Sequence, residues 1–308
     1  MEATQPVAVV VPTRNRASML RRTLDAILAQ SVPAKILVMD DASSDETEAM
    51  VRRDYPQAAY FREDRNRGPT FQRNKGVGLG ASPIVFTIDD DCILASPTIL
   101  QQTLDAFDHP RVGAVTLPFI NVLQDSTVRT AAPDDGKILA GFDYFGGMVA
   151  FRRDVFLGIG GYRTFLFMHM EESDLAIRLL DAGYIVRLGW AQPLQHMESP
   201  LGKPVRLHDL GARNNILYCF YNVPWPQFPL HLAATTVKCL HHATRVGYPM
   251  RGVRGVLRGY AGILHEIRRR DPVSRTTYRL SRILRDKKAT PLAEIEPQLS
   301  PMRSFSAP

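Results

Sequence analysis

The sequence has no apolar run of roughly 18 residues, so we expect no helix that spans a bilayer. Cysteine is scarce: Cys92, Cys219 and Cys239 are odd in number, lie far apart and lack the spacing of metal ligands. We therefore expect a reducing compartment and no disulfide framework. The first residues contain no basic segment followed by an apolar core, so no signal peptide is predicted and a cytoplasmic location is expected.

Basic residues are outnumbered in the first two thirds of the chain and abundant in the last third. Residues 1–200 hold 20 Lys and Arg against 25 Asp and Glu, whereas residues 201–308 hold 18 against 6. This division predicts a catalytic body followed by a basic extension. No nucleic-acid-binding motif accompanies the arginines, so nucleic acid is not an expected partner.

Strands and helices are predicted to alternate through the first 120 residues. Short apolar runs rich in β-branched residues predict strands, and periodic apolar residues between them predict helices. In addition, Ser43 and Glu46 have capping-box spacing, which predicts a helix start there. This order indicates an α/β fold with a mostly parallel sheet covered on both faces. The strands are expected at residues 7–11, 36–39, 58–61, 84–88 and 112–117.

The rest of the chain divides into three expected parts. The catalytic domain is expected to span residues 1–203 and to contain a polar loop or flap over residues 124–141. Helical periodicity predicts a basic extension over residues 204–289, with helices at 212–221, 230–245, 253–270 and 276–288. Residues 290–308 contain four prolines and little periodicity, so we expect a disordered tail.

Three consecutive aspartates, Asp89, Asp90 and Asp91, follow the predicted strand at residues 84–88. Their carboxylates should emerge at the carboxyl end of that strand, where open α/β sheets bind ligands. Carboxylate oxygens suit Mg²⁺ or Mn²⁺, which commonly bind one or two carboxylates together with substrate phosphates. The alternative is an acidic, solvated loop.

Four segments together resemble the family 2 glycosyltransferases of the GT-A fold. They are VVVPTRNRASMLRRTLDAILAQ, ILVMDDASSDET, RNRGPTFQRNKGVGLGASPIVFTIDDDC and EESDLAIRLLDAGY, and the resemblance covers roughly residues 6–200. It implies a Rossmann-like catalytic domain that moves a sugar from a nucleotide-diphosphate donor to an acceptor hydroxyl, with inversion of the anomeric carbon. Cell-surface polysaccharide or glycolipid synthesis is the expected setting, with a glycan or lipid-linked acceptor.

The resemblance also implies where the donor binds. It assigns the nucleotide contact to Asp41, although a helix-capping role is the alternative. Arg73 is expected to pair either with a phosphate or with the aspartates. The expected donor-binding residues are Pro12, Thr13, Arg14, Asp41, Gly68, Arg73, Asp89 and Asp90.

Asp89 and Asp91 match the family's D-x-D pair. We expect Asp91 to bind Mg²⁺ or Mn²⁺ directly, and Asp89 to contact the ribose or water bound to the metal. A histidine near the position of His196 completes the metal site in some members of the family. A purely structural histidine is the alternative.

The EESDL segment supplies candidates for the catalytic base at the start of a helix, where the helix dipole favours carboxylates. Alignment with the family places Glu172 in the base position, although the family commonly has Asp there. Asp174 is the second candidate, and Arg178 lies on the same helix face, where it can orient Asp174. Helix capping is the structural alternative.

The basic extension has two interpretations. Its helices either lie on an anionic membrane surface, which suits a lipid-linked acceptor, or pack their apolar sides onto the body or another subunit. Two other functions also remain open at this point. A sugar-phosphate nucleotidyltransferase has a related architecture, and a non-catalytic, membrane-docking protein needs only the basic helices. The sequence leaves the oligomeric state open.

Overall fold

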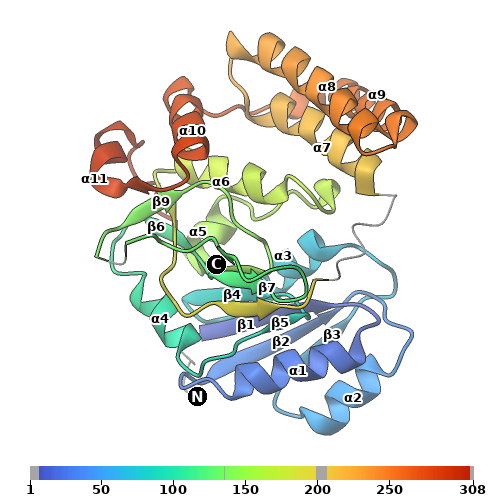
Figure 1. Cartoon of the computed structure of the whole chain (residues 1–308), viewed down its shortest axis with the longest axis vertical. Coiled ribbons are helices and arrows are strands. Elements are labelled where there is room, and N and C mark those ends of the chain that lie inside the picture. The colour runs from blue at the N-terminus through green and yellow to red at the C-terminus, as the bar shows by residue number, and fades with distance from the viewer. Residues whose placement is uncertain (1–6, 135, 199–206, 306–308) are drawn as a thin grey trace.

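The computed structural model describes residues 7–134, 136–198 and 207–305. Within them, a nine-stranded mixed sheet runs in the order β13-β9-β11-β6-β10-β4-β1-β2-β3, and a four-stranded sheet in the order β5-β12-β7-β8 (Figure 1). The strands of the large sheet are β1 (Val7–Thr13), β2 (Ala34–Asp40), β3 (Ala59–Arg62), β4 (Ile84–Ile88), β6 (Val112–Thr116), β9 (Leu139–Gly141), β10 (Met148–Arg152), β11 (Ile185–Arg187) and β13 (Thr290–Pro291). Those of the small sheet are β5 (Cys92–Ile93), β7 (Phe119–Asn121), β8 (Val128–Arg129) and β12 (Leu194–His196).

The parallel half of the large sheet confirms the predicted fold class. Strands β4, β1, β2 and β3 are parallel neighbours, while β10 lies antiparallel between β4 and β6. The five strands expected from the sequence correspond to β1, β2, β3, β4 and β6. Because these strands point the same way, their carboxyl ends lie along one edge of the sheet.

Alternation along each strand builds a core on both faces of the sheet. In β1, Val7 and Val9 point to one core and Ala8 and Val10 to the other. The first core is covered by α1 (Ala17–Leu28), α2 (Thr47–Asp54) and α4 (Ile99–Asp105). The second is covered by α3 (Pro69–Leu79), α5 (Arg153–Gly158) and α6 (Glu171–Asp181).

The predicted C-terminal helices are present. They are α7 (Leu207–Asn222), α8 (Gln227–Arg245), α9 (Pro249–Glu266) and α10 (Arg275–Lys287). Figure 1 shows α7, α8 and α9 as a layer at the end of the molecule, away from the large sheet. Among the described residues, no helix combines the length and the apolar character needed to cross a membrane. The expected domain boundary at residues 203–204 lies outside the described residues.

The prediction of a disordered tail is wrong for residues 290–305. After β13, the chain forms α11 (Leu292–Ile295) and the short 3₁₀ helix η3 (Glu296–Gln298). Leu292, Ile295 and Leu299 are buried in the same core as α6 and α10. The prolines interrupt helical periodicity without preventing this packing, because the three apolar residues still reach the sheet.

Two local predictions also need correction. Helix α2 begins at Thr47, whose backbone N–H donates to the carboxylate of Asp45 at 3.1 Å. Ser43 instead accepts a hydrogen bond from the backbone of Asn15 at 2.9 Å, so the predicted capping box does not form. The segment over residues 124–141, expected to be a loop, contains the short strands β8 and β9. The sequence did not predict β12, because a strand of three residues is too short to show a periodic pattern.

Candidate active site

The three consecutive aspartates take different partners. Asp89 accepts a hydrogen bond from Arg73 at 2.7 Å. Asp90 accepts from Thr13 at 2.7 Å and from Arg16 at 3.0 Å, and Asp91 accepts from the same Arg16 at 2.7 Å. These cationic partners explain how a fold tolerates three adjacent carboxylates at the end of β4.

Asp90 follows β4, and its carboxylate contacts the connection between β1 and α1 through Thr13 and Arg16. Its side chain is buried, and its backbone oxygen accepts a hydrogen bond from Thr23 at 2.8 Å. Burial raises the pKa of Asp90 to about 7, although Arg16 opposes the shift. This position disfavours the expected contact of Asp90 with the donor, because its carboxylate is already enclosed by the chain.

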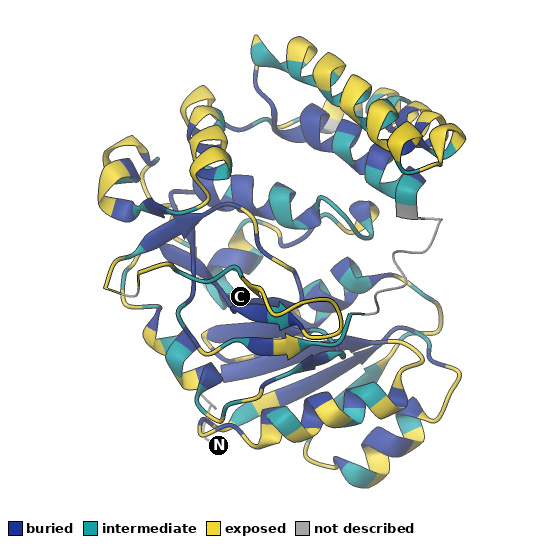
Figure 2. Ribbon diagram, in the orientation of Figure 1, coloured by how far each residue is buried: buried dark blue, intermediate teal, exposed yellow. Residues whose placement is uncertain are grey.

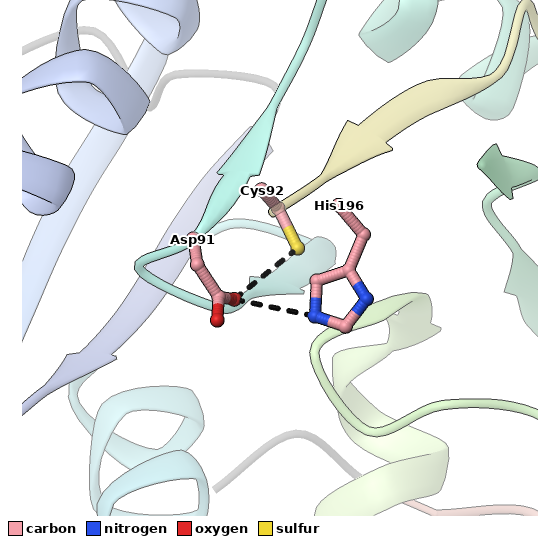
Figure 3. Close-up of side chains that lie close together, drawn as sticks. All are labelled: Asp91, Cys92 and His196. Atoms are coloured by element: carbon pink, nitrogen blue, oxygen red, sulfur yellow. Dashed lines mark hydrogen bonds and ion pairs between the residues drawn. The ribbon is translucent and has the colours of Figure 1, made fainter. Parts of the chain in front are cut away.

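Asp91, Cys92 and His196 form a cluster of possible metal ligands (Figure 3). One ligand atom from each side chain lies within 4.8 Å of the others, and His196 Nε2 is 3.4 Å from Asp91 Oδ1. The structure thus brings the predicted pair Asp91 and His196 together. Asp89, the other member of the D-x-D pair, lies outside this cluster and directs its carboxylate to Arg73.

The small sheet produces this cluster through its register. His196 on β12 lies opposite Cys92 on β5 and, on the other side, beside Asn121 on β7. The Oδ1 atom of Asn121 lies 2.7 Å from His196 Nδ1. With Nδ1 donating to that amide oxygen, Nε2 keeps its lone pair and points toward Asp91.

The charges around His196 favour its protonation as long as no cation is present. Burial lowers the pKa of His196, but the hydrogen bond and the charge of Asp91 outweigh burial and raise it above its ordinary value. For Asp91, burial raises the pKa, and His196 together with Arg16 brings it below the ordinary value. A divalent cation between the two side chains would take the place of this proton.

The residues of the cluster fit a divalent cation with mixed nitrogen and oxygen ligands. A carboxylate suits Mg²⁺ and Mn²⁺, whereas an imidazole suits transition metals better than Mg²⁺. Burial raises the pKa of the Cys92 thiol well above its ordinary value, so this side chain is neutral beside the other two. Asp91 and His196 together thus offer one oxygen ligand and one nitrogen ligand to a divalent cation.

A second cluster lies where the loop before β10 meets the start of α6. Arg73, which is buried, lies between Asp89 and Glu171, with 3.8 Å separating its NH1 from Glu171 Oε1. A Cβ atom on Gly146 would overlap the guanidinium of Arg73, and one on Gly147 would overlap the carboxylate of Asp89. The glycine pair therefore permits the close approach of these two side chains.

Glu172 is the candidate base, and its surroundings differ from those of its neighbour Glu171. Glu172 is half-buried, and its Oε1 accepts a hydrogen bond from the backbone of Gly146 at 3.4 Å. Glu171 is buried, which raises its pKa well above the ordinary value. The charge of Glu172 adds to this shift, and Arg73 opposes it. Glu172 is thus the more accessible carboxylate of the pair.

Asp174, the second candidate base, is enclosed by donors. Its carboxylate accepts hydrogen bonds from Arg163, from Arg178 at 2.7 and 3.0 Å, and from Asn222 at 2.8 Å. The side chain is only 1% exposed. Burial raises its pKa, but the two arginines outweigh burial and lower it. A buried, fully bonded carboxylate is poorly placed to take a proton from an acceptor.

Asp41 lies at the amino end of α3. It accepts hydrogen bonds from the backbone of Arg67 at 2.7 Å and of Gly68 at 2.9 Å, and from the side chain of Gln72 at 2.8 Å. These contacts hold the Asp41 carboxylate at the amino end of α3, whereas the capping alternative concerned α2, the next helix along the chain. Because only Gly68 donates to Oδ2 among these contacts, that oxygen retains acceptor capacity for a nucleotide.

The remaining predicted donor residues lie at the ends of β1 and α3. Pro12 and Thr13 are buried, and Arg14 is exposed. Gly68 has φ of +86°, and a Cβ atom there would lie 2.5 Å from the ring of Phe167, so this position requires glycine. These placements leave the predicted donor contacts of Pro12, Thr13, Arg14 and Gly68 as predictions.

The sequence reasoning missed three residues of this region. Arg16 bonds both Asp90 and Asp91, Asn121 orients His196, and Cys92 joins the cluster. Arg16 lies in the PTRNR stretch of the first segment that resembles family 2, so its position near the site could have been inferred from the sequence. Asn121 and Cys92 depend on strand pairing in the small sheet, and such pairing has no local sequence signal.

The family model described as Glycosyl transferase family 2 matches residues 8–173. The chain belongs to this family. Membership favours glycosyl transfer over the nucleotidyltransferase and binding-protein alternatives.

Two relatives show the range of the family 2 similarity. A glucosyl-dolichyl phosphate glucuronosyltransferase of Haloferax volcanii is 29% identical over 182 residues, which cover 51% of this chain and 56% of that protein. The O-antigen chain rhamnosyltransferase RfbN of Salmonella typhimurium is 28% identical over 201 residues, or 58% of this chain and 62% of that protein. The chain thus spans less than two thirds of the length of these relatives.

Solved structures confirm the GT-A fold. The mannosyltransferase PcManGT of Pyrobaculum calidifontis, in complex with GDP-Man and Mn²⁺, aligns with a TM-score of 0.56 at 21% identity, covering 92% of this chain and 85% of that one. GalNAc-T7 with UDP, GalNAc and Mn²⁺ aligns with a TM-score of 0.62 at 14% identity, covering 87% and 58% of the two chains.

Proposed function

We propose that this chain is a metal-dependent, inverting glycosyltransferase that uses a nucleotide-diphosphate sugar. The observation that carries the proposal is the 3.4 Å approach of His196 Nε2 to Asp91 Oδ1 at the end of the sheet that binds ligands in α/β folds. Asp91 and His196 would hold Mn²⁺ or Mg²⁺. The bound cation would neutralise the charge that develops on the leaving nucleoside diphosphate.

The chain's own residues would bind and orient the donor beside that cation. Arg73 carries a buried positive charge and donates a hydrogen bond to Asp89 at 2.7 Å. Asp89 is one third exposed, so it remains available to a ribose hydroxyl or to water around the cation. Asp41 Oδ2 supplies a further acceptor for the nucleotide at the amino end of α3.

Glu172 would act as the base. Its carboxylate takes the proton of the acceptor hydroxyl, and the acceptor oxygen forms a bond to the anomeric carbon. The bond from that carbon to the diphosphate oxygen breaks, and its electron pair leaves with the nucleoside diphosphate. A single displacement of this kind inverts the anomeric carbon and requires no nucleophile from the enzyme.

A lipid-linked saccharide or a growing glycan is the proposed acceptor. The names of the similar proteins support this class, because they include enzymes of glucosyl-dolichyl phosphate, of GalNAc(5)-diNAcBac-PP-undecaprenol and of O-antigen. Cell-surface polysaccharide or glycolipid synthesis is accordingly the proposed setting.

Measuring turnover of nucleotide-diphosphate sugars with and without Mn²⁺ tests the proposal. Asp91→Asn should remove the response to Mn²⁺, and Glu172→Gln should abolish transfer while leaving the affinity for nucleoside diphosphate unchanged. Asp174→Asn serves as the comparison. It should lower the stability of the fold, and any remaining folded enzyme should still transfer sugar. Full activity of Glu172→Gln, or of the wild-type enzyme with all divalent cations chelated, contradicts the mechanism.

A further inference from the structure

Helices α8 and α9 have an unusual distribution of small and large residues. The side of α9 that packs onto α7 and α8 is lined by glycines at helical spacing: Gly252, Gly255, Gly259 and Gly262. A Cβ atom on Gly259 would lie 2.6 Å from Ile216 Cβ of α7, so a larger residue cannot occupy this position. At these glycines α9 lies close to α7 and α8, and Val256 of α9 is buried between them.

Large apolar side chains instead occupy the outer sides of both helices. We call this surface the α8–α9 face; it consists of Leu230, Val237, Met250, Val253, Leu257 and Leu264. The exposed fractions of Leu257 and Leu264 are 64% and 75%. Figure 2 shows the outer sides of α8 and α9 as exposed, in contrast to the largely buried α7. A helix that faces water normally has the reverse arrangement, with polar residues outside.

Basic residues border the apolar side chains of the α8–α9 face. Arg254 and Arg258 lie along one edge of α9 and are 68% and 54% exposed. Together with Arg251 they surround a single carboxylate, that of Asp209, at distances of 3.4 to 4.0 Å. Three arginines against one aspartate leave this edge positively charged, in keeping with the excess of Lys and Arg over residues 201–308.

We propose that the α8–α9 face rests on an anionic membrane surface. Apolar side chains enter the boundary of the acyl chains, and the arginines contact the phosphate groups of anionic lipids at the level of the headgroups. A second copy of this chain is a weaker candidate occupant, because a symmetric pairing would bring the same positive edges together.

The contact would also orient the active site relative to the membrane. Asn214 of α7 is buried and donates to the backbone oxygens of Leu166 at 2.7 Å, Met168 at 2.8 Å and His169 at 2.9 Å. This segment leads directly into α6, which carries Glu172. The α8–α9 face is therefore connected through α7 to the segment that precedes the proposed base. A membrane contact at this face would fix the orientation of the active site, which the proposed chemistry does not address.

Flotation of the purified full chain with vesicles tests this proposal without any activity assay. Phosphatidylcholine vesicles with and without phosphatidylglycerol are compared at low and at high salt. We expect binding to the vesicles that contain phosphatidylglycerol, with Leu257→Ser plus Leu264→Ser lowering the partition coefficient by about tenfold or more. Arg254→Gln plus Arg258→Gln should weaken the preference for phosphatidylglycerol.

A matched control replaces leucines that are exposed on the catalytic body. Leu28→Ser plus Leu79→Ser removes two side chains that are 45% and 43% exposed on α1 and α3, and vesicle binding should not change. The proposal is overturned if the Leu257 and Leu264 variant binds the vesicles as well as the wild-type chain does. It is also overturned if the wild-type chain does not bind the vesicles. In that case a dimer in sedimentation equilibrium that the same variant dissociates would identify a second copy as the occupant of the face. Thermal unfolding of each variant confirms that it is folded.

Discussion

Arg73 donates a hydrogen bond of 2.7 Å to the carboxylate of Asp89, and its other terminal nitrogen lies 3.8 Å from the buried carboxylate of Glu171. One buried cation thus joins the end of β4, where the proposed cation site begins, to the start of α6, which carries the proposed base. Removing it should affect both stability and catalysis.

Arg73→Met should destabilise the fold by about 3 kcal/mol, because breaking a buried ion pair leaves a carboxylate without its partner. Turnover should also fall, because the guanidinium of Arg73 contacts both Asp89 and the loop at Gly146 and is lost in this variant. Urea unfolding and donor turnover measure the two effects. Arg52→Met is the control: Arg52 pairs with Glu48 on the surface, and its loss should cost less than about 0.5 kcal/mol.

Gly147 has no room for a side chain. Gly147→Ala would drive a methyl group into the Asp89 carboxylate, so we expect turnover to fall by at least about tenfold and stability by about 1–3 kcal/mol. Gly78→Ala, in α3, places its methyl group in open space. That control should leave turnover unchanged and stabilise the helix by up to about 1 kcal/mol. Wild-type turnover in Gly147→Ala would remove Asp89 from the proposed site.

The sequence predicts those parts of the site that follow directly from strand ends. Asp91 was identifiable because it follows a continuous apolar strand, and the resemblance to family 2 placed His196 near it. The pairing of Arg73 with Asp89 was one of two alternatives, because a phosphate of the donor could bind the same guanidinium. Asp90 shows the limit, because nothing in its local sequence indicates that its carboxylate is enclosed by Thr13 and Arg16.

Long-range pairing explains the features that the sequence did not predict. The contact between Asn121 and His196 depends on the register of β7 against β12, two strands of three residues that carry little periodic signal. The order of residues 290–305 depends on Leu292 and Ile295 finding a core made by other parts of the chain. The prolines of this segment suggested disorder, and local composition does not reveal the distant core against which the two residues pack.

Asn121 should tune the affinity for the cation through His196. Asn121→Leu removes the amide oxygen that lies 2.7 Å from His196 Nδ1, so the Mn²⁺ concentration for half-maximal turnover should rise by about 10- to 100-fold. Asn121→Asp keeps an acceptor at this position and should restore most of the affinity. Gln124→Ala, an exposed change in the same loop, should have little effect. An unchanged response to Mn²⁺ in Asn121→Leu would mean that His196 is not a ligand.

The contact between His231 of α8 and Tyr278 of α10 should make this junction sensitive to acid. His231 Nδ1 lies 2.6 Å from the hydroxyl of Tyr278, and burial, followed by the charges of Arg282, Arg285 and Lys238, lowers the pKa of His231 to about 4. An unfolded histidine titrates near pH 6.5. Because the folded pKa is the lower one, the neutral side chain contributes its full stability above about pH 6.5, and this contribution is lost as the pH falls toward 4.

His231→Gln removes this titration, so its free energy of unfolding should fall less steeply than that of the wild-type chain between about pH 6.5 and pH 4. After allowance for partial exposure to solvent, the difference between the two curves should change by about 1 kcal/mol over this range. Urea unfolding at a series of pH values measures it, and carboxylates titrate equally in both proteins. His265→Gln, an exposed histidine of α9, should follow the wild-type curve. Parallel curves for His231→Gln and the wild-type chain would show that His231 is protonated without cost in the folded state.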